Sequence, residues 1–208
     1  MKSIFLILLV SCSGTLFSQT ANNISKKASE YNNQGTAKGR MKLYADAVIE
    51  FTRVIEIDSQ NDRAYRNRGS AKDGLGDYEG AIADFTKAIA IDPNEANGYI
   101  GRGIVKGKLE DYEGAIADFT KAITIRPDDE RAYIGRGAAK GRMGNNSEAI
   151  ADYTKAIEIN PGYALSYMNR GKAKDELGDK DGACRDWRKA GELGDKRAEN
   201  LLIKKLCY

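Results

Sequence analysis

The sequence has no histidine and only three cysteines among its 208 residues. Without histidine, the chain has neither the base of a Ser-His-Asp or Cys-His catalytic site nor the commonest ligand of a zinc site. It also lacks a glycine-rich phosphate loop, because its glycines recur at a regular spacing. Cys184 and Cys207, the two cysteines outside the N-terminal apolar stretch, are too few to hold zinc. We therefore expect no catalytic residues, no cofactor and no metal site.

The chain also has little net charge. Its 33 Lys and Arg residues nearly balance its 30 Asp and Glu residues, which leaves a formal charge of +3. No run of Lys and Arg is interleaved with aromatic residues. Nucleic-acid-binding surfaces combine a strong basic excess with such patterns, so we expect no nucleic-acid partner.

Residues 1–18 differ from the rest of the sequence. Lys2 is followed by a short apolar run, Ile4 to Val10, which is too short to span a bilayer and is typical of a bacterial secretory signal peptide. We expect an exported protein, periplasmic or extracellular. Lys2 is the only charged residue in this segment, so removal of residues 1–18 lowers the formal charge of the protein from +3 to +2.

Two processing sites compete in this segment. Ser18 offers a small residue for ordinary cleavage, and the continuing apolar or small residues 13–18 favour that site. The stretch Leu9 to Cys12 resembles a bacterial lipobox, which would attach a lipid to Cys12 and make the protein an outer-membrane lipoprotein. We expect membrane contact only in that case. Residues 19–27 are polar and aperiodic, and we expect a flexible lead there.

The remaining sequence repeats every 34 residues. The segment Asp77 to Ile89 returns unchanged as Asp111 to Ile123, and looser copies begin at Asn145 and Asp179. A fixed period of this length indicates stacked supersecondary units.

Each repeat has the pattern of two helices joined by a tight turn. Asp77 is a suitable N-cap for the second helix, and Pro93 ends it. A first helix is expected from Arg63 to Leu75, with Gly76 in the left-handed conformation after it. The apolar residues of the second helix share one face: Ala81, Ile82, Phe85, Ala88 and Ile89. The sequence therefore predicts an all-α fold.

Small residues recur at one position of each helix. A glycine inside a helix costs about 1 kcal/mol relative to alanine, so its recurrence predicts a close crossing of the two helices. Bulky aromatic residues recur beside that crossing. The three sets are Gly69, Gly103, Gly137 and Gly171; Ala81, Ala115, Ala149 and Ala183; and Phe85, Phe119, Tyr153 and Trp187.

These positions are similar to the tetratricopeptide repeat (TPR) pattern, as the second unit shows with Tyr65, Gly69, Ala81, Phe85, Ala88 and Pro93. The resemblance implies a right-handed α-solenoid whose first helices line a concave groove, with a protein or peptide partner. Imperfect caps would allow a weak end-to-end dimer as well as a monomer. The expected segments are a degenerate repeat at 28–61, repeats at 62–95, 96–129, 130–163 and 164–197, and a capping helix at 198–208.

The chain departs from the family at two positions of the first helix, which carry arginine and lysine. We predict ion pairs with aspartates of the second helix, and the alternative is a basic groove for acidic peptides. The predicted pairs are Arg68 with Asp84, Arg102 with Asp118, Arg136 with Asp152, and Arg170 with Asp186.

The family register also predicts which residues line the groove. They are Arg63, Arg66, Ser70, Asn97, Ile100, Ile104, Arg131, Ile134, Ala138, Met168 and Lys172, with Asp73, Gly107 and Gly141 at the last position. Ile100, Ile104, Ile134 and Met168 would then form an exposed apolar patch, which often marks an interface. The alternative is that they pack against neighbouring helices.

The two remaining cysteines lie near each other in the expected fold. Cys184 occupies a position that is isoleucine in earlier repeats, so we expect it to be buried, and Cys207 lies on the capping helix. A disulfide between them is expected in an exported protein and would contribute about 3 kcal/mol, and two buried thiols are the alternative. Taken together, the sequence favours a non-enzymatic binding scaffold. A structural or assembly subunit of a bacterial envelope complex is the alternative.

Overall fold

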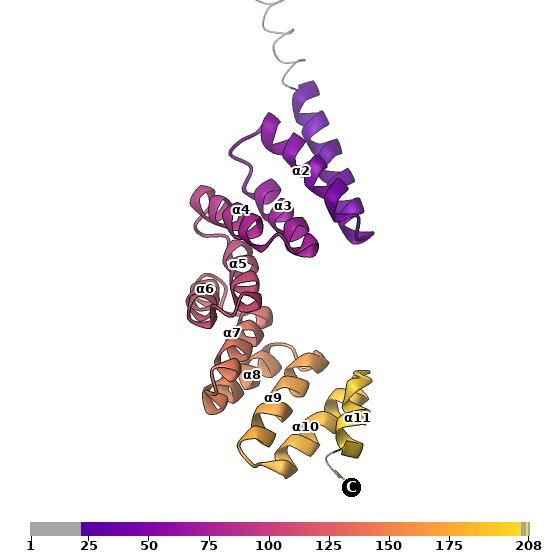
Figure 1. The fold of residues 1–208 in the computed structure, drawn as a ribbon, viewed down its shortest axis with the longest axis vertical. Helices are drawn as coiled ribbons and strands as arrows, with labels where there is room; N and C mark the ends of the chain where they lie inside the picture. The colour runs from indigo at the N-terminus through magenta and orange to yellow at the C-terminus, as the bar shows by residue number, and fades with distance from the viewer. Residues whose placement is uncertain (1–21, 205–206, 208) are drawn as a thin grey trace, which may run out of the picture. The chain divides into compact units, whose positions relative to one another are not determined.

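The computed structural model describes residues 22–204 and residue 207, and every regular element in this part of the chain is an α-helix (Figure 1). The proposed signal segment and Cys12 lie outside the described residues. A helix over residues 22–40 comes first. The later helices are α2 (Tyr44–Ile57), α3 (Asp62–Leu75), α4 (Tyr78–Ile91), α5 (Ala96–Lys108), α6 (Tyr112–Ile125), α7 (Glu130–Arg142), α8 (Asn146–Ile159), α9 (Ala164–Glu176), α10 (Lys180–Glu192) and α11 (Arg197–Lys204).

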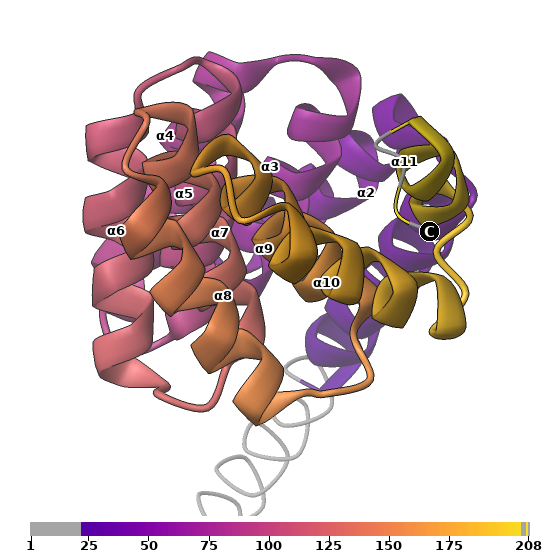
Figure 2. The ribbon, with the colours of Figure 1, turned by 90° about the horizontal axis from the view of Figure 1, so that it is seen from below.

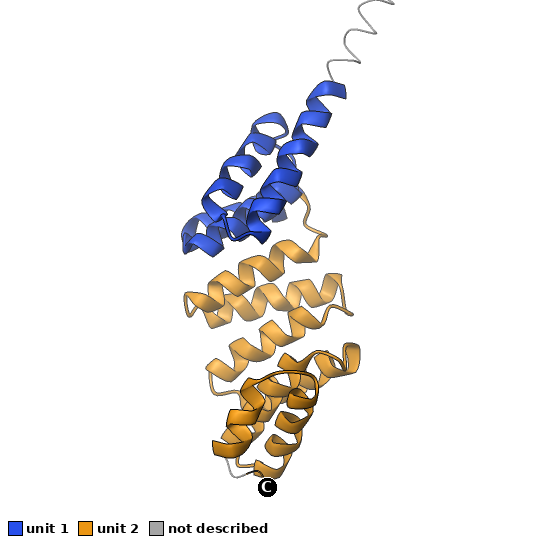
Figure 3. Cartoon of the chain, turned by 90° about the vertical axis from the view of Figure 1, so that its right-hand side faces the viewer, with its two compact units in different colours: residues 1–91 blue, residues 92–208 orange. Residues whose placement is uncertain are grey.

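The helices divide between two compact units, unit 1 ending at residue 91 and unit 2 beginning at residue 92 (Figure 3). In unit 1, α3 packs on both α2 and α4. In unit 2, α5 pairs with α6, α7 with α8 and α9 with α10, and each pair packs on the next. The first helices are also neighbours, α5 with α7 and α7 with α9. Figure 2 shows α8, α9, α10 and α11 following one another.

The local signals in the sequence account for the helix boundaries. Asp111 caps α6 by accepting a hydrogen bond from the Gly114 N–H at 2.9 Å. Gly76, with φ of 81°, ends α3 in the left-handed region as predicted. Two repeats use a non-glycine residue at that turn position, Lys42 with φ of 60° and Glu110 with φ of 64°.

The predicted close crossing of the paired helices is present. A Cβ atom added to Gly103 would lie 3.2 Å from the Phe119 ring, and one added to Gly171 would lie 2.6 Å from Trp187 Nε1. Trp187 is 1% exposed and its Nε1 donates to the Met168 carbonyl at 3.4 Å. It is a core residue, as its register predicted.

The N-terminal end differs from the expected flexible lead, because residues 22–27 are helical. Ile24, Lys27 and Tyr31 recur at helical spacing and line a pocket together with Arg53 and Ile57 of α2. The Arg53 guanidinium lies 5.3 Å from the Tyr31 ring centroid, so this face of the helix has a packing partner. No helix within the described residues has the length and apolar character needed to cross a membrane.

At the other end, α11 packs on α10 as a cap. Leu193, Leu201 and Leu202 pack against the cluster that contains Trp187. Cys184 and Cys207 are disulfide-bonded, with their Cα atoms 5.5 Å apart. Cys184 is half-buried instead of buried, because it lies at the margin of this cluster beside the half-buried Cys207.

Candidate functional site

The arginines and aspartates of the predicted pairs form what we call the ion-pair ladder. Arg68 Nη2 lies 2.7 Å from Asp84 Oδ1, and Arg68 Nε donates to Asp84 Oδ2 at 2.9 Å. The same two-pronged contact recurs in every later repeat: Arg102 with Asp118, Arg136 with Asp152, and Arg170 with Asp186. The second basic position, which the sequence left unassigned, joins the same carboxylate, as Lys72 shows at 2.9 Å from Asp84.

The ladder also crosses from one repeat to the one before it. Arg68 Nη1 donates to Thr52 Oγ1 at 3.1 Å, and Arg170 Nη1 donates to Thr154 Oγ1 at 3.1 Å. The hydrogen bonds to Asp84 raise the pKa of Arg68 above its usual value. Because each guanidinium is bound to a buried acid of its own repeat, the geometry favours the structural role over a basic groove.

In the first repeat the ladder has a different composition. Glu50 is buried and pairs with Lys38 at 2.6 Å and with Arg53 at 3.0 Å. The hydrogen bond from Lys38 lowers the pKa of Glu50, against the effect of burial. Lys38 is the first-repeat equivalent of Lys72, and Arg53 of α2 supplies the second cation where Gln34 takes the place of the arginine.

Three of the four apolar residues predicted to lie exposed in the groove are buried. Ile100 is 4% exposed, and Ile134 and Met168 are each 8% exposed, whereas Ile104 is 44% exposed. Ile134 packs in a cluster with Tyr153 of the second helix, and Met168 packs with Trp187. This position of the first helix faces the helices beside it, so the predicted apolar patch is wrong for these three residues.

The other predicted groove residues fall into two groups. Arg66 is paired with Asp62 at 3.2 Å, and Arg131 binds Asp129 at 2.7 Å and Asn97 at 2.8 Å, so both are held by their own unit. Burial works to raise the pKa of Asp129, but the contacts with Arg131 lower it below its usual value. Besides Arg131, the exposed ones are Arg63, Ser70, Ile104, Ala138 and Lys172.

Ile104 and Ala138 line a pocket of about 420 Å³ in unit 2, which we call the Phe119 pocket. Part of this space lies beside Gly107 of α5, where the nearest atom to an added Cβ would be 4.0 Å away. A Cβ atom on Gly135 would come within 2.3 Å of the Phe119 ring, so the ring occupies the room that this glycine leaves. The full lining is Gly103, Ile104, Gly107, Lys108, Glu110, Tyr112, Phe119, Gly135, Ala138, Ala139 and Arg142.

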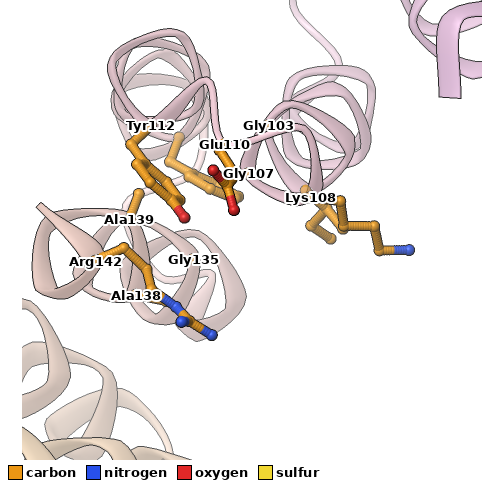
Figure 4. A pocket seen from close by; sticks show the side chains of 11 residues that line it. Gly103, Gly107, Lys108, Glu110, Tyr112, Gly135, Ala138, Ala139 and Arg142 are labelled. Atoms are coloured by element: carbon orange, nitrogen blue, oxygen red, sulfur yellow. The ribbon is translucent and has the colours of Figure 1, made fainter.

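The rim of the Phe119 pocket is charged. Figure 4 shows the side chains of Tyr112 and Glu110 on one side of the pocket and that of Arg142 on another. The Lys108 ammonium points away from these three side chains (Figure 4). An apolar floor with both signs of charge at its opening can hold an apolar side chain and fix the charged groups beside it.

A second pocket of about 450 Å³, the Tyr153 pocket, adjoins the first and shares Ala138 and Arg142 with it. Its lining is more polar and includes Asn146, Asn169, Lys172 and Glu176. Burial raises the pKa of Tyr153, and the Asp152 charge adds to the effect, so the phenol stays protonated at neutral pH. Apart from Ala138, Lys172, Ile104, Gly107 and Gly141, sequence reasoning missed these lining residues.

The described residues contain no group of three or more Asp, Glu or Cys side chains that could hold a metal ion. They do contain a row of exposed apolar residues, one in the turn of each repeat. In unit 2 these are Leu109, Met143 and Leu177, which are all exposed.

Family models match parts of the sequence. The model described as Tetratricopeptide repeat matches residues 62–95 and 130–163, and the one described as TPR repeat matches residues 108–144. The chain is a tetratricopeptide repeat protein. TPR proteins are in general non-catalytic scaffolds for protein–protein interaction, and this chain has their architecture.

Solved TPR structures resemble this TPR protein along most of its length. A crystal structure of MamA is 25% identical, covers 84% of this chain and 96% of its own, and has a TM-score of 0.68. The crystal structure of YrrB, described as a TPR protein with an unusual peptide-binding site, is 21% identical over 90% of this chain and 97% of its own, with a TM-score of 0.67. Pseudomonas aeruginosa PilF is 16% identical over 88% of this chain and 84% of its own, with a TM-score of 0.80. No curated protein matches the sequence.

Proposed function

We propose that this TPR protein binds an extended segment of a partner protein in the two adjoining pockets of unit 2. The observation that carries the proposal is that the Phe119 pocket and the Tyr153 pocket meet at Ala138 and Arg142. Together they offer an apolar site and a polar site side by side. Neighbouring side chains of an extended peptide can fill two such sites at once.

The shape of the site supports a peptide over a small molecule. Both pockets are open to solvent along the first helices, and exposed Ile104 and Ala138 lie on their walls. The resemblance to YrrB, a TPR protein with a peptide-binding site, agrees with this choice.

The variant Ala138→Trp tests this function, because an exposed alanine at the junction can be enlarged without disturbing the core. The matched control is Ala151→Trp, an exposed alanine on α8 outside both pockets. A phage library of random peptides is selected on the wild-type protein. We expect the enriched peptides to lose binding to Ala138→Trp and to keep it on Ala151→Trp. Equal binding to both variants would place the site elsewhere and refute the proposal.

A second function, assembly within a bacterial envelope complex, is favoured by the exposed turn residues Leu109, Met143 and Leu177. The pockets do not use these side chains. Replacing all three with Ser would release the protein from a complex isolated under native conditions, while peptide binding stays unchanged. Retention of the triple variant in that complex would rule this role out.

We infer that the protein acts after export. The Cys184–Cys207 bridge supports this, because structural disulfides persist in oxidising compartments. The intact mass of protein from its native host tests the inference. A mass that starts at Gln19 supports a soluble exported scaffold, and one that starts at Cys12 with acyl chains supports a lipoprotein. A mass that includes residues 1–11 would contradict export.

A further inference from the structure

Two opposite charges line the Phe119 pocket without pairing. Glu110 and Arg142 both border it, and neither side chain has an ion-pair partner within the described residues. Figure 4 shows the Glu110 carboxylate and the Arg142 guanidinium well separated. Several other basic residues of the first helices do bind an acid of their own unit, as Arg136 and Lys140 do with Asp152.

Glu110 is also held in a costly backbone conformation. Its φ is 64°, in the left-handed region, whereas the equivalent turn residues Gly76, Gly144 and Gly178 are glycines. A residue with a side chain pays about 1 kcal/mol or more in this region. The carboxylate therefore occupies the pocket rim at some cost to stability, and the turn itself does not require it.

The Tyr153 pocket carries an excess of positive charge. Arg142 and Lys172 line it against one carboxylate, that of Glu176. No acid of the described residues pairs with Arg142 or Lys172. The asparagine amides of Asn146 and Asn169 add further hydrogen-bonding groups at the same place.

We propose that the groove selects a segment in which an apolar residue lies between a basic residue and an acidic residue. The inference rests on the proposed function and names the partner's chemistry. The apolar side chain fills the Phe119 pocket, the basic group pairs with Glu110, and the carboxylate lies over Arg142 and Lys172 in the Tyr153 pocket.

Charge complementarity favours this occupant over two simpler ones. A segment that is acidic on both sides would bring a carboxylate against Glu110. A purely apolar segment would cover Glu110 and Arg142 and leave both without a partner, which is unfavourable for charged groups that lose water. A segment with one basic and one acidic residue gives both Glu110 and Arg142 a partner of opposite charge.

The experiment uses a labelled peptide library with leucine fixed at the centre and every amino acid scanned on each side. Wild-type protein is expected to select Lys or Arg on one side and Asp or Glu on the other. Both chain directions are present in the library, so the selected order is a result of the experiment.

Glu110→Gly is the decisive variant. It is expected to raise the urea midpoint, because the strained residue is removed. It should lose the preference for a basic peptide residue and keep the preference for an acidic one. Each lost surface pair is expected to weaken binding about two- to five-fold. Arg142→Gln should lose the acidic preference alone. Lys42→Gly, the equivalent turn residue of unit 1, is the matched control and should raise the midpoint without changing selection.

The outcomes separate the two proposals. Selection of Leu-centred peptides with no charge preference would overturn this inference and leave the peptide-binding function standing. If no Leu-centred peptide binds wild-type protein, the peptide-binding function and the inference fall together. A Glu110→Gly protein with unchanged selection would likewise overturn the inference.

Discussion

In unit 1, a pocket of about 210 Å³ lies beside Phe51, and in unit 2 the Phe119 pocket measures about 420 Å³. Every residue of the smaller pocket has its equivalent in the larger one, two repeats further along. The two pockets thus have the same origin in the fold and differ only in side chains. The residues that line the smaller pocket are Gly35, Thr36, Gly39, Tyr44, Phe51, Asn67, Ser70 and Ala71.

Two sequence differences between the equivalent positions account for the smaller volume of the pocket in unit 1. Asn67 occupies the position of Gly135, and its amide donates to Asn32 Oδ1 at 3.4 Å, so it takes up part of the space. Gly74 occupies the position of Arg142, and the Tyr44 ring lies so close that a Cβ on Gly74 would be 2.8 Å from it. The ion-pair ladder is therefore the framework that the two units share. The side chains that line the pockets differ between the units and would determine what each pocket can bind.

The largest expected effect concerns the framework. Asp84→Ala in unit 1 and Asp152→Ala in unit 2 each leave an arginine and a lysine without their buried acid. We expect each change to cost about 3–5 kcal/mol, measured by urea denaturation followed by circular dichroism. Glu158→Ala, which removes an exposed pair, is the control and should leave the midpoint unchanged. A cost in one unit only would show that the ladder is not a shared framework.

The next effect concerns the pockets themselves. Gly135→Ala should destabilise the protein by about 1–3 kcal/mol, because the new Cβ would force the Phe119 ring to move. Alanine is the better helix former, so the loss would come from packing alone. Asn67→Ala at the equivalent position should cost less than about 1 kcal/mol, since its side chain is only half-buried. Equal denaturation midpoints for the two variants would contradict this account of the pockets.

A smaller effect, which is a gain of stability instead of a loss, is expected when Ser166 is replaced. Its hydroxyl is buried without a hydrogen-bond partner, and alanine occupies the equivalent positions Ala64 and Ala132. Ser166→Ala should therefore stabilise the protein by about 1 kcal/mol. A differential scanning measurement of Tm checks this. A lower Tm would mean that the hydroxyl has a stabilising role after all.

The smallest effect is a pH dependence that distinguishes the N-caps of α3 and α7. Asp129 caps α7 and its pKa is lowered, whereas the equivalent cap of α3 is the uncharged Asn61. A lowered pKa contributes stability above about pH 4 that is lost as the pH falls through the folded-state pKa. Urea midpoints between pH 5 and pH 3 should fall less steeply for Asp129→Asn than for wild type. Identical slopes would refute the contribution of Asp129.

Much of the fold could be predicted from the sequence, for a physical reason. Asp77, Gly76 and Pro93 set helix ends through local backbone chemistry, and the 34-residue period repeats those signals along the chain. The ion pairs could also be predicted, because Arg and Asp recur together from repeat to repeat. The register of Cys184 and the cap predicted that the two cysteines lie together, and left open whether they form a disulfide or two thiols.

The groove was harder to predict. Ile100, Ile134 and Met168 lie one turn away from exposed positions, and only packing decides that they face their neighbours. The Phe119 pocket depends in part on a missing side chain at Gly107, whereas the room at Gly103 is filled by the Phe119 ring. A glycine that leaves a cavity and a glycine that permits a close crossing look the same in a sequence.

Arg68, Arg136 and Arg170 each donate a hydrogen bond to a threonine of the preceding repeat, and this bears on how such an array can lengthen. A repeat carries the arginine of one junction at its start and the threonine of the next junction near its end, as Arg136 and Thr154 show. An extra copy inserted by tandem duplication would therefore bring both halves of its junctions with it. The identical segments at residues 77–89 and 111–123 fit growth of this kind, in which a gene gains a repeat without having to evolve a new interface.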